Sequence, residues 1–170
     1  MFKIVQKDNP ILRGKAQEIP IEDIRGRKIQ KVIGDMKKAL EFQEDGVAIA
    51  APQIGVPLRI FVISERIHAL MEIKTDTHED MVFINPKIIR LSKEKKMTDE
   101  GCLSVRYLYG KVKRSIKATI EAYDVQGNKF RKDGHGLLAQ IFQHEIDHLE
   151  GVLFTDKAND IEEMLPPQAL

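Results

Sequence analysis

The chain has 170 residues, of which 42% are hydrophobic and 31% charged, and its formal net charge is +1 at pH 7. This composition is typical of a globular protein, and the length suits a single domain over residues 1–170 with a core of its own. A charge so close to zero gives no overall electrostatic basis for binding nucleic acid, a membrane surface or an acidic partner.

The sequence also predicts a cytoplasmic protein of bacterial type. Its first ten residues, MFKIVQKDNP, lack the apolar core of a signal peptide and show no transit peptide, and no apolar run reaches the ~18 residues of a membrane span. The single cysteine cannot form a disulfide within the chain, which suits a reducing compartment. We therefore expect no membrane partner and no direct binding to DNA.

An amphipathic helix is predicted over residues 24–46, ending near Asp45 and Gly46. Its apolar side chains recur at steps of three and four residues: Ile29, Val32, Ile33, Met36 and Leu40. Lysines occupy the opposite face, so one side of this helix should pack on the core and the other should face solvent.

Strands are predicted over residues 58–64, 81–86, 87–91 and 115–123. The first is rich in residues that favour strands, and Pro86 separates the second from the third. Apolar and polar residues alternate in the last, which indicates a strand with one buried face. The polar segments 68–80 and 92–99 are predicted to be loops.

A second helix is predicted over residues 136–150. Leu137, Ile141, His144 and His148 follow one another at steps of four, three and four, so they form one stripe along the helix. Because this stripe begins with apolar residues, we expect the two histidines to face the core. The expected fold class is therefore α+β, with antiparallel β-sheets packed around this helix.

Residues 144–148 read HEIDH, a pattern expected by chance only about 0.01 times in a chain of this composition. Two histidines one helical turn apart can hold a metal ion, while Glu145 lies beside the ion as a base. A catalytic metal site usually has three protein ligands and one open position, and this helix supplies two. A third ligand should therefore come from elsewhere in the chain.

The third ligand is expected upstream of the helix. Downstream, Phe154 stands where a metzincin would have its third histidine, and too few residues follow for a ligand on a further helix. The upstream candidates are His68, His78, Cys102 and His135. The first two lie in a polar segment and His135 is flanked by glycines, whereas a thiolate is a strong ligand for zinc or iron. Cys102 is the favoured candidate.

Three motifs, GVAIAAPQIG at 46–55, EGCLS at 100–104 and QHEIDH at 143–148, together resemble the peptide deformylase family. NPILRGKAQEI near the start and HLEGVLF near the end extend the resemblance over most of the chain. The resemblance implies a single catalytic domain over residues 1–170, with antiparallel sheets around a central helix that binds the metal ion. It also implies a hydrolase that removes the formyl group from the N-terminal formyl-methionine of newly made polypeptides and releases formate.

The resemblance implies that three residues bind the metal ion: Cys102, His144 and His148. Glu145 would be the general acid and base, and the Gln53 amide and the Leu103 backbone N–H would stabilise the negative charge on the formyl oxygen. The substrate would contact a further set of residues: Gly46, Val47, Ala48, Ile49, Glu100, Gly101 and Ile141. Asp147 faces away from the two histidines, and the resemblance suggests Arg114 as its ion-pair partner.

The implied cofactor is one divalent metal ion. Cys-His-His suits zinc and iron(II) alike, and the resemblance implies Fe²⁺, with Zn²⁺, Ni²⁺ or Co²⁺ as ions that a purified sample could carry. The implied partners are formyl-methionyl nascent peptides, together with the ribosome near its exit tunnel.

The chain departs from the family pattern at three positions. Ala48 stands where a second glycine is usual, Arg106 where proline is common after EGCLSV, and Gln140 where arginine is common before the histidine motif. None of the three is an implied ligand or the base. We therefore expect them to affect rate and specificity and to leave the class of reaction unchanged.

Two other interpretations share the metal site. An H-E-x-x-H metallopeptidase would cut internal peptide bonds, but Cys102 is an unusual ligand for that class. The other interpretation is non-catalytic: a structural metal site in a binding module, or an inactive relative. A structural site would want a fourth protein ligand and no neighbouring base. The sequence shows no evident fourth ligand, and it has Glu145 beside His144.

Overall fold

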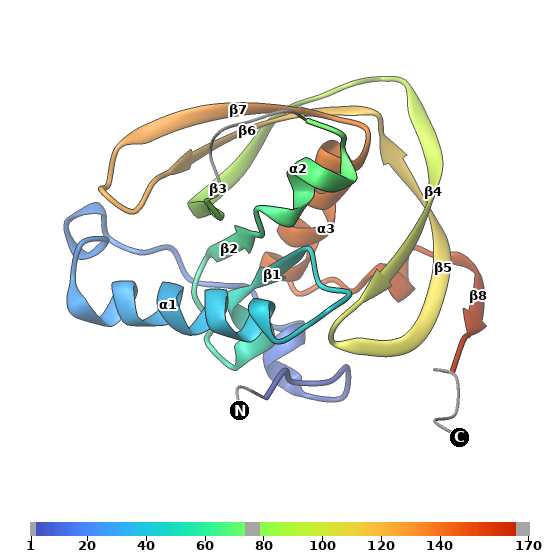
Figure 1. The fold of residues 1–170 in the computed structure, drawn as a ribbon, viewed down its shortest axis with the longest axis horizontal. Helices are drawn as coiled ribbons and strands as arrows, with labels where there is room; N and C mark the ends of the chain where they lie inside the picture. Colours follow the sequence, from blue (N-terminus) through green and yellow to red (C-terminus); the bar gives the residue numbers. More distant parts are fainter. Residues whose placement is uncertain (1–2, 74–78, 166–170) are drawn as a thin grey trace.

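Two antiparallel β-sheets and a few helices form the fold in the computed structural model, which describes residues 3–73 and 79–165 (Figure 1). The first sheet has the order β1-β2-β3-β6-β7 and contains β1 (Ala48–Ala50), β2 (Ile60–Ile63), β3 (Met81–Leu91), β6 (Lys117–Tyr123) and β7 (Lys129–His135). The second has the order β4-β5-β8 and contains β4 (Lys95–Cys102), β5 (Val105–Ser115) and β8 (Asn159–Glu163). The expected α+β class with antiparallel sheets is confirmed.

The chain passes from one sheet to the other twice at the same corner, between β3 and β4 and between β5 and β6. The backbone N–H of Ser92 donates to Lys117 O at 3.0 Å, and that of Ile116 donates to Glu94 O at 3.2 Å, so the two crossings are hydrogen-bonded to each other. β1 forms one edge of the first sheet and β4 forms one edge of the second. Each sheet therefore keeps a strand with one free side.

The α-helices of the described residues are α1 (Arg27–Glu41), α2 (Arg66–Leu70) and α3 (Leu137–Leu149). The predicted apolar face of α1 is buried, apart from Val32, which is partly exposed. Beyond Glu41 the chain leaves the helix and turns, with Gly46 N–H donating to Gln43 O, so the helix is shorter than the 24–46 predicted. No helix in residues 3–73 and 79–165 has the length and apolar character needed to cross a bilayer.

α3 contacts β1, β3, β6 and β7 of the first sheet and β5 of the second, as Figure 1 shows. Its apolar anchor is Phe142, whose ring lies edge-on to Phe83 at 5.4 Å between centroids. Phe83 in turn stacks on Phe61 at 4.5 Å. A Cβ at Gly134 of β7 would lie only 2.8 Å from the Phe142 ring, so a glycine there lets the helix approach the sheet closely.

Polar contacts also fix α3 against the end of β5. The Gln143 side chain accepts from Ser115 N at 3.0 Å and donates to Ser115 O at 2.9 Å. This pair of bonds satisfies the buried N–H and C=O groups at the end of β5 and fixes the orientation of α3 about its own axis. The rotation matters because the next residue along α3 is His144.

Two predictions about strands were wrong. β4 occupies most of the segment 92–99 that was predicted to be a loop, because a charged edge strand needs no apolar alternation when its partner β5 supplies the hydrogen bonds. β3 runs through Pro86 without a break, because the register shifts between Ile84 and Lys87 and this irregularity accommodates a residue without N–H. Within the predicted loop 68–80, residues 68–70 belong to α2, and residues 74–78 lie outside the described part.

Candidate active site

The end of β4 brings Cys102 to the two histidines of α3. The donor atoms of the three side chains all lie within 4.8 Å of one another, and Cys102 Sγ is 3.2 Å from His148 Nε2. The imidazole rings of the two histidines are 4.9 Å apart between centroids and steeply inclined to each other. The upstream cysteine favoured by the sequence is therefore the candidate that the fold places beside the helix.

The three donors suit a divalent metal ion of the zinc and iron(II) kind. One thiolate and two imidazoles form a common donor set for these ions, and the set leaves a coordination position open. Burial alone would raise the pKa of the Cys102 thiol, but the two neighbouring histidines outweigh burial and hold that pKa well below its ordinary value. The cysteine is thus set to be a thiolate, the form that binds a metal ion.

A buried ion-pair network orients His144. Glu100 Oε2 lies 2.9 Å from His144 Nδ1, so the other ring nitrogen is left for the donor cluster. Arg114 donates to both carboxylate oxygens of Glu100 at 2.7 and 2.9 Å and to Asp147 at 2.7 Å. Burial raises the pKa of Glu100, but Arg114 and His144 outweigh it and lower that pKa to about 2. Glu100 therefore stays ionised, and the expected pairing of Asp147 with Arg114 is present.

The contact between Glu100 and His144 was not foreseen, although the sequence carried a signal for it. Glu100 and Cys102 are two residues apart on a strand, so their side chains leave the same face of the sheet. The Cys102 thiol and the Glu100 carboxylate can therefore both reach the two histidines of α3. Glu100 lines the cavity, as expected of a residue near the substrate, but its carboxylate is taken up by Arg114 and His144.

The network leads to a stability prediction for Arg114→Met. The Arg114 and Glu100 side chains are only 5% and 2% exposed, so removing the guanidinium leaves the buried Glu100 carboxylate without its arginine partner. The free energy of unfolding should fall by about 3–5 kcal/mol. Urea denaturation of matched metal-loaded samples would measure it. Arg131→Met, which removes an exposed pair with Glu121, is the control and should lower the free energy of unfolding far less. Equal losses in the two variants would contradict the prediction.

Glu145 lies beside the donor cluster and faces the cavity. The side chain is buried, and its Oε2 has no hydrogen-bond partner within the described residues. Burial raises its pKa above the ordinary value. A carboxyl with a free oxygen and a raised pKa can exchange a proton with a molecule bound in the cavity.

Gln53 and Ser104 are polar residues beside the Cys102 sulfur. Gln53 lies in the short 3₁₀ turn η3 (Ala51–Ile54) after β1, where its Oε1 accepts from Ala50 N at 2.8 Å. This bond directs its amide nitrogen towards Ser104 Oγ at 3.1 Å and Cys102 Sγ at 3.6 Å. Ser104 N also donates to Cys102 Sγ at 3.4 Å. The sequence did not single out Ser104, although it follows the cysteine by only two residues.

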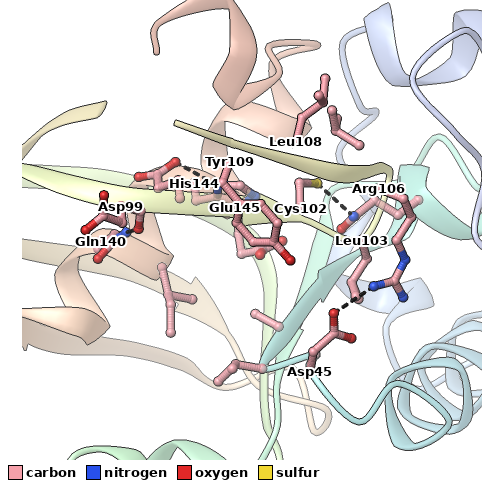
Figure 2. A pocket seen from close by; sticks show the side chains of 18 of the residues that line it. Asp45, Asp99, Cys102, Leu103, Arg106, Leu108, Tyr109, Gln140, His144 and Glu145 are labelled. Carbon is pink, nitrogen blue, oxygen red and sulfur yellow. Dashed lines mark hydrogen bonds and ion pairs between the residues drawn. The ribbon is translucent and has the colours of Figure 1, made fainter. Parts of the chain in front are cut away.

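A cavity joins these groups, and Figure 2 shows its labelled side chains around Cys102. One wall is the segment Gly46–Ala48, and a second is the end of β4 with Gly101 and Leu103. α3 forms the third side with Ile141, His144 and Glu145, among others. The structure thus brings together all but one of the expected residues of the site, with His148 at the back of the donor cluster.

Ile49 is the residue that the structure places elsewhere. It was expected in the substrate site, but its side chain is fully buried in the core around α1. Successive residues of a strand point to opposite faces, so Ala48 lines the cavity and Ile49 faces the core. Of the other proposed third ligands, His68 lies in α2 and His135 at the exposed end of β7, both outside the cluster, while His78 lies outside the described residues.

Comparison with known proteins accords with this geometry. The sequence matches the family "Polypeptide deformylase" over residues 1–164. The chain belongs to this family. Peptide deformylase 2 of Clostridium acetobutylicum is 41% identical over 150 residues, covering 88% of this chain and 89% of that protein. The peptide deformylase of Thermomicrobium roseum is 40% identical, with 92% and 85% covered.

Solved structures of deformylases share the fold. The enzyme from Thermotoga maritima has a TM-score of 0.80 and 29% identity, covering 94% of this chain and 98% of that one. The enzyme from Legionella pneumophila has a TM-score of 0.80 and 37% identity, with 93% and 86% covered. Metal-dependent hydrolysis of the formyl group at the amino terminus of a polypeptide, the reaction of the deformylase family, is therefore the reaction of this chain.

Proposed function

We propose that residues 1–170 form one catalytic domain that takes N-terminal formyl-methionine of nascent polypeptides into the cavity beside Cys102. The observation that carries the proposal is the meeting of Cys102, His144 and His148 with Glu145 at one cavity. Water would add to the formyl carbon, the carbon–nitrogen bond would break, and formate and a free amino terminus would leave. α3 would be the central metal-binding helix, because it carries two of the three ligands and contacts both sheets.

Cys102, His144 and His148 would hold one divalent ion, which we propose to be Fe²⁺. The thiolate and imidazole donors also suit Zn²⁺, Ni²⁺ and Co²⁺, so a purified sample could carry any of these ions. A bound ion would supply Lewis acidity, which makes hydroxide available from water near neutral pH and polarises a carbonyl group. The Glu100 carboxylate would keep His144 in the orientation that this site needs.

Glu145 would move the proton in this reaction. It would take a proton from the attacking water and give it to the nitrogen of the departing amine, so one carboxyl would act as base and then as acid. Its burial and its Oε2, which has no hydrogen-bond partner within the described residues, support this role, because that oxygen is available to a bound molecule. The raised pKa of Glu145 makes protonation easier than for an exposed glutamate.

Gln53 and the backbone N–H of Leu103 would stabilise the negative charge that develops on the formyl oxygen. The anchored Gln53 amide, turned towards Cys102, supports its part in this proposal. Donors held in place before the reaction stabilise such charge without the cost of reorganising during it.

Gln53→Ala should lower kcat by about 10²-fold, because one preorganised donor to the developing charge is lost. KM should change less, since the oxygen of the bound formamide carries less charge than the oxygen in the transition state. Steady-state formate release at fixed metal content would measure both constants. A kcat within about threefold of wild type would show that the amide does not serve the reacting oxygen.

The substrate main chain would lie as an extended strand between the free edges of β1 and β4. Two edge strands that border the same cavity support this arrangement, since an extended peptide can hydrogen-bond to an open edge. The methionine side chain would pack against Val47, Ala48 and Ile141, with Glu100 and Gly101 on the opposite wall. The first side chain of the substrate would then meet mostly apolar atoms.

Substrates of this kind emerge from the ribosome, so we propose that the enzyme works in the cytoplasm near the exit tunnel. The direct test of the proposed function is formate release from a formyl-methionyl tripeptide after anaerobic loading of the protein with each metal. The same peptide without its formyl group is the control. Internal cleavage of the control would instead indicate a metallopeptidase, and absence of both reactions would indicate a structural metal site.

A further inference from the structure

Arg106 connects the two walls of the cavity. It lies in β5, four residues after Cys102, and its Nη1 donates to Asp45 Oδ2 at 2.7 Å. Its Nη2 donates to Gln43 Oε1. Figure 2 shows the bond to Asp45 crossing from the strand side to the segment before β1. The two partners lie more than sixty residues before Arg106 in the sequence, so these bonds join separate parts of the fold.

The segment held by Arg106 has no regular structure of its own. Residues 43–47 lie between α1 and β1 and include Gly46, which lines the cavity. On the core side, Arg66 donates to the carbonyl oxygens of Leu40, Gln43 and Glu44. Arg66 thus holds the segment to the body of the protein, whereas Arg106 holds it to the opposite wall of the cavity.

The position of this connection indicates which part of a substrate it affects. β1 leads from Gly46 towards Gln53, and Gln53 lies beside Cys102. A substrate peptide would have its formyl group at Cys102. Its second and later residues would then pass Gly46 and the Arg106–Asp45 pair. The hydrogen bonds that Arg106 makes within the described residues go to Asp45 and Gln43 and not to the donor cluster or Glu145, so the pair would not touch the reacting atoms.

We propose that Arg106 is a positioning residue that sets the width of the substrate groove through Asp45 and Gln43, and so determines the affinity for the main chain beyond the first residue. The inference rests on the proposed function. Arginine suits the task because its planar guanidinium donates to two acceptors at once in a fixed geometry. The side chains of Arg106 and Asp45 are 30% and 60% exposed, so water and salt partly screen the pair.

The test compares kcat and KM for formyl-methionine amide and for a formyl-methionyl tripeptide amide. Arg106→Ala should raise KM for the tripeptide about fivefold, the size expected for a partly exposed ion pair, with kcat within about twofold of wild type. The change for formyl-methionine amide should be smaller than about twofold. Asp45→Ala should raise the tripeptide KM by no more than Arg106→Ala does, because the bond to Gln43 remains, and the double variant should be no worse than Arg106→Ala.

Three further measurements tie the effect to the ion pair. Exchanging the charges, with Arg106→Asp and Asp45→Arg in one protein, should recover part of the lost tripeptide affinity. Arg106→Lys, which keeps the charge but loses the two-acceptor geometry, should fall between wild type and Arg106→Ala. Added salt should raise the tripeptide KM of wild type more than that of Arg106→Ala. Arg131→Ala, which removes an exposed arginine paired with Glu121, should leave all constants at wild-type values.

Several results would overturn the inference. A kcat loss without a KM change would place Arg106 in the chemistry, and equal KM changes for both substrates would mean a general loosening of the fold. If Asp45→Ala kept the wild-type KM for the tripeptide, Arg106 would not act through Asp45. If Arg106→Ala fails to fold or to hold metal, Arg106→Lys and Asp45→Asn make the same comparison. Formate release by the wild-type protein is measured first. Its absence would count against the proposed function and not against the role of Arg106 in the substrate groove.

Discussion

Glu145→Ala should keep its metal ion and lose turnover by about 10²-fold or more, because Glu145 is the proposed carrier of the proton and is not a ligand. The Glu145 carboxyl lines the cavity, and its buried Oε2 has no hydrogen-bond partner within the described residues, so it is free to act on a bound molecule. Glu100 lines the same cavity but is engaged by Arg114 and His144. The loss should appear in kcat, since the proton moves only during the reaction.

The experiment on Glu145 requires two measurements on the same sample. Metal analysis establishes that the site is intact, and formate release from a formyl-methionyl peptide gives kcat and KM. Glu145→Gln is the matched variant, because it keeps the size and polarity of the side chain but cannot carry the proton. Turnover within about tenfold of wild type at full metal content would mean that another group moves the proton.

Cys102→Ala should lose tight metal binding, with occupancy after dialysis against a chelator falling from about one ion per chain to below about a tenth. The reason is the loss of one of three donors and of the negative charge on the thiolate. His144 and His148 would remain on α3, but two imidazole donors bind a divalent ion far more weakly than three donors do. Formate release should fall in parallel.

The single cysteine provides an independent measure of the same site. In wild-type protein the thiol should react slowly with a thiol reagent while the ion is bound and faster after a chelator removes it, because coordination occupies the sulfur lone pairs. His135→Ala is the control, since that histidine lies outside the cluster and its loss should leave metal content unchanged. Full occupancy in Cys102→Ala would mean that the third ligand had been misassigned.

The strongly periodic parts of the fold could be predicted from the sequence. α1, β6 and α3 show the repeat of a helix or strand over many residues, and each of them was found with errors only at its ends. β4 and β8 could not be found in this way, because KKMTDEGC and NDIEE have no apolar repeat. Both strands exist because β5 lies between them and supplies their hydrogen bonds, which is information from distant parts of the chain.

The candidate site was predictable where a motif fixed both residue and spacing. HEIDH predicted two ligands and a base on one helix, and the elimination of other histidines pointed to Cys102. The path from Arg114 through Glu100 to His144 was not foreseen, since the family resemblance suggested only the bond from Arg114 to Asp147 and not the two to Glu100. Whether a side chain serves the substrate or another side chain depends on contacts that only the folded chain defines.

The free strand edges at the cavity have a consequence for solubility. An unfolded polypeptide near an open sheet edge can add to it, and continued addition leads to aggregation. β1 presents only three residues, Ala48–Ala50, which is too short to support a growing intermolecular sheet. β4 is longer, but Lys95, Lys96 and Asp99 are exposed charges along it. An enzyme that receives unfolded chains can thus admit one short segment at a time without becoming a template for them.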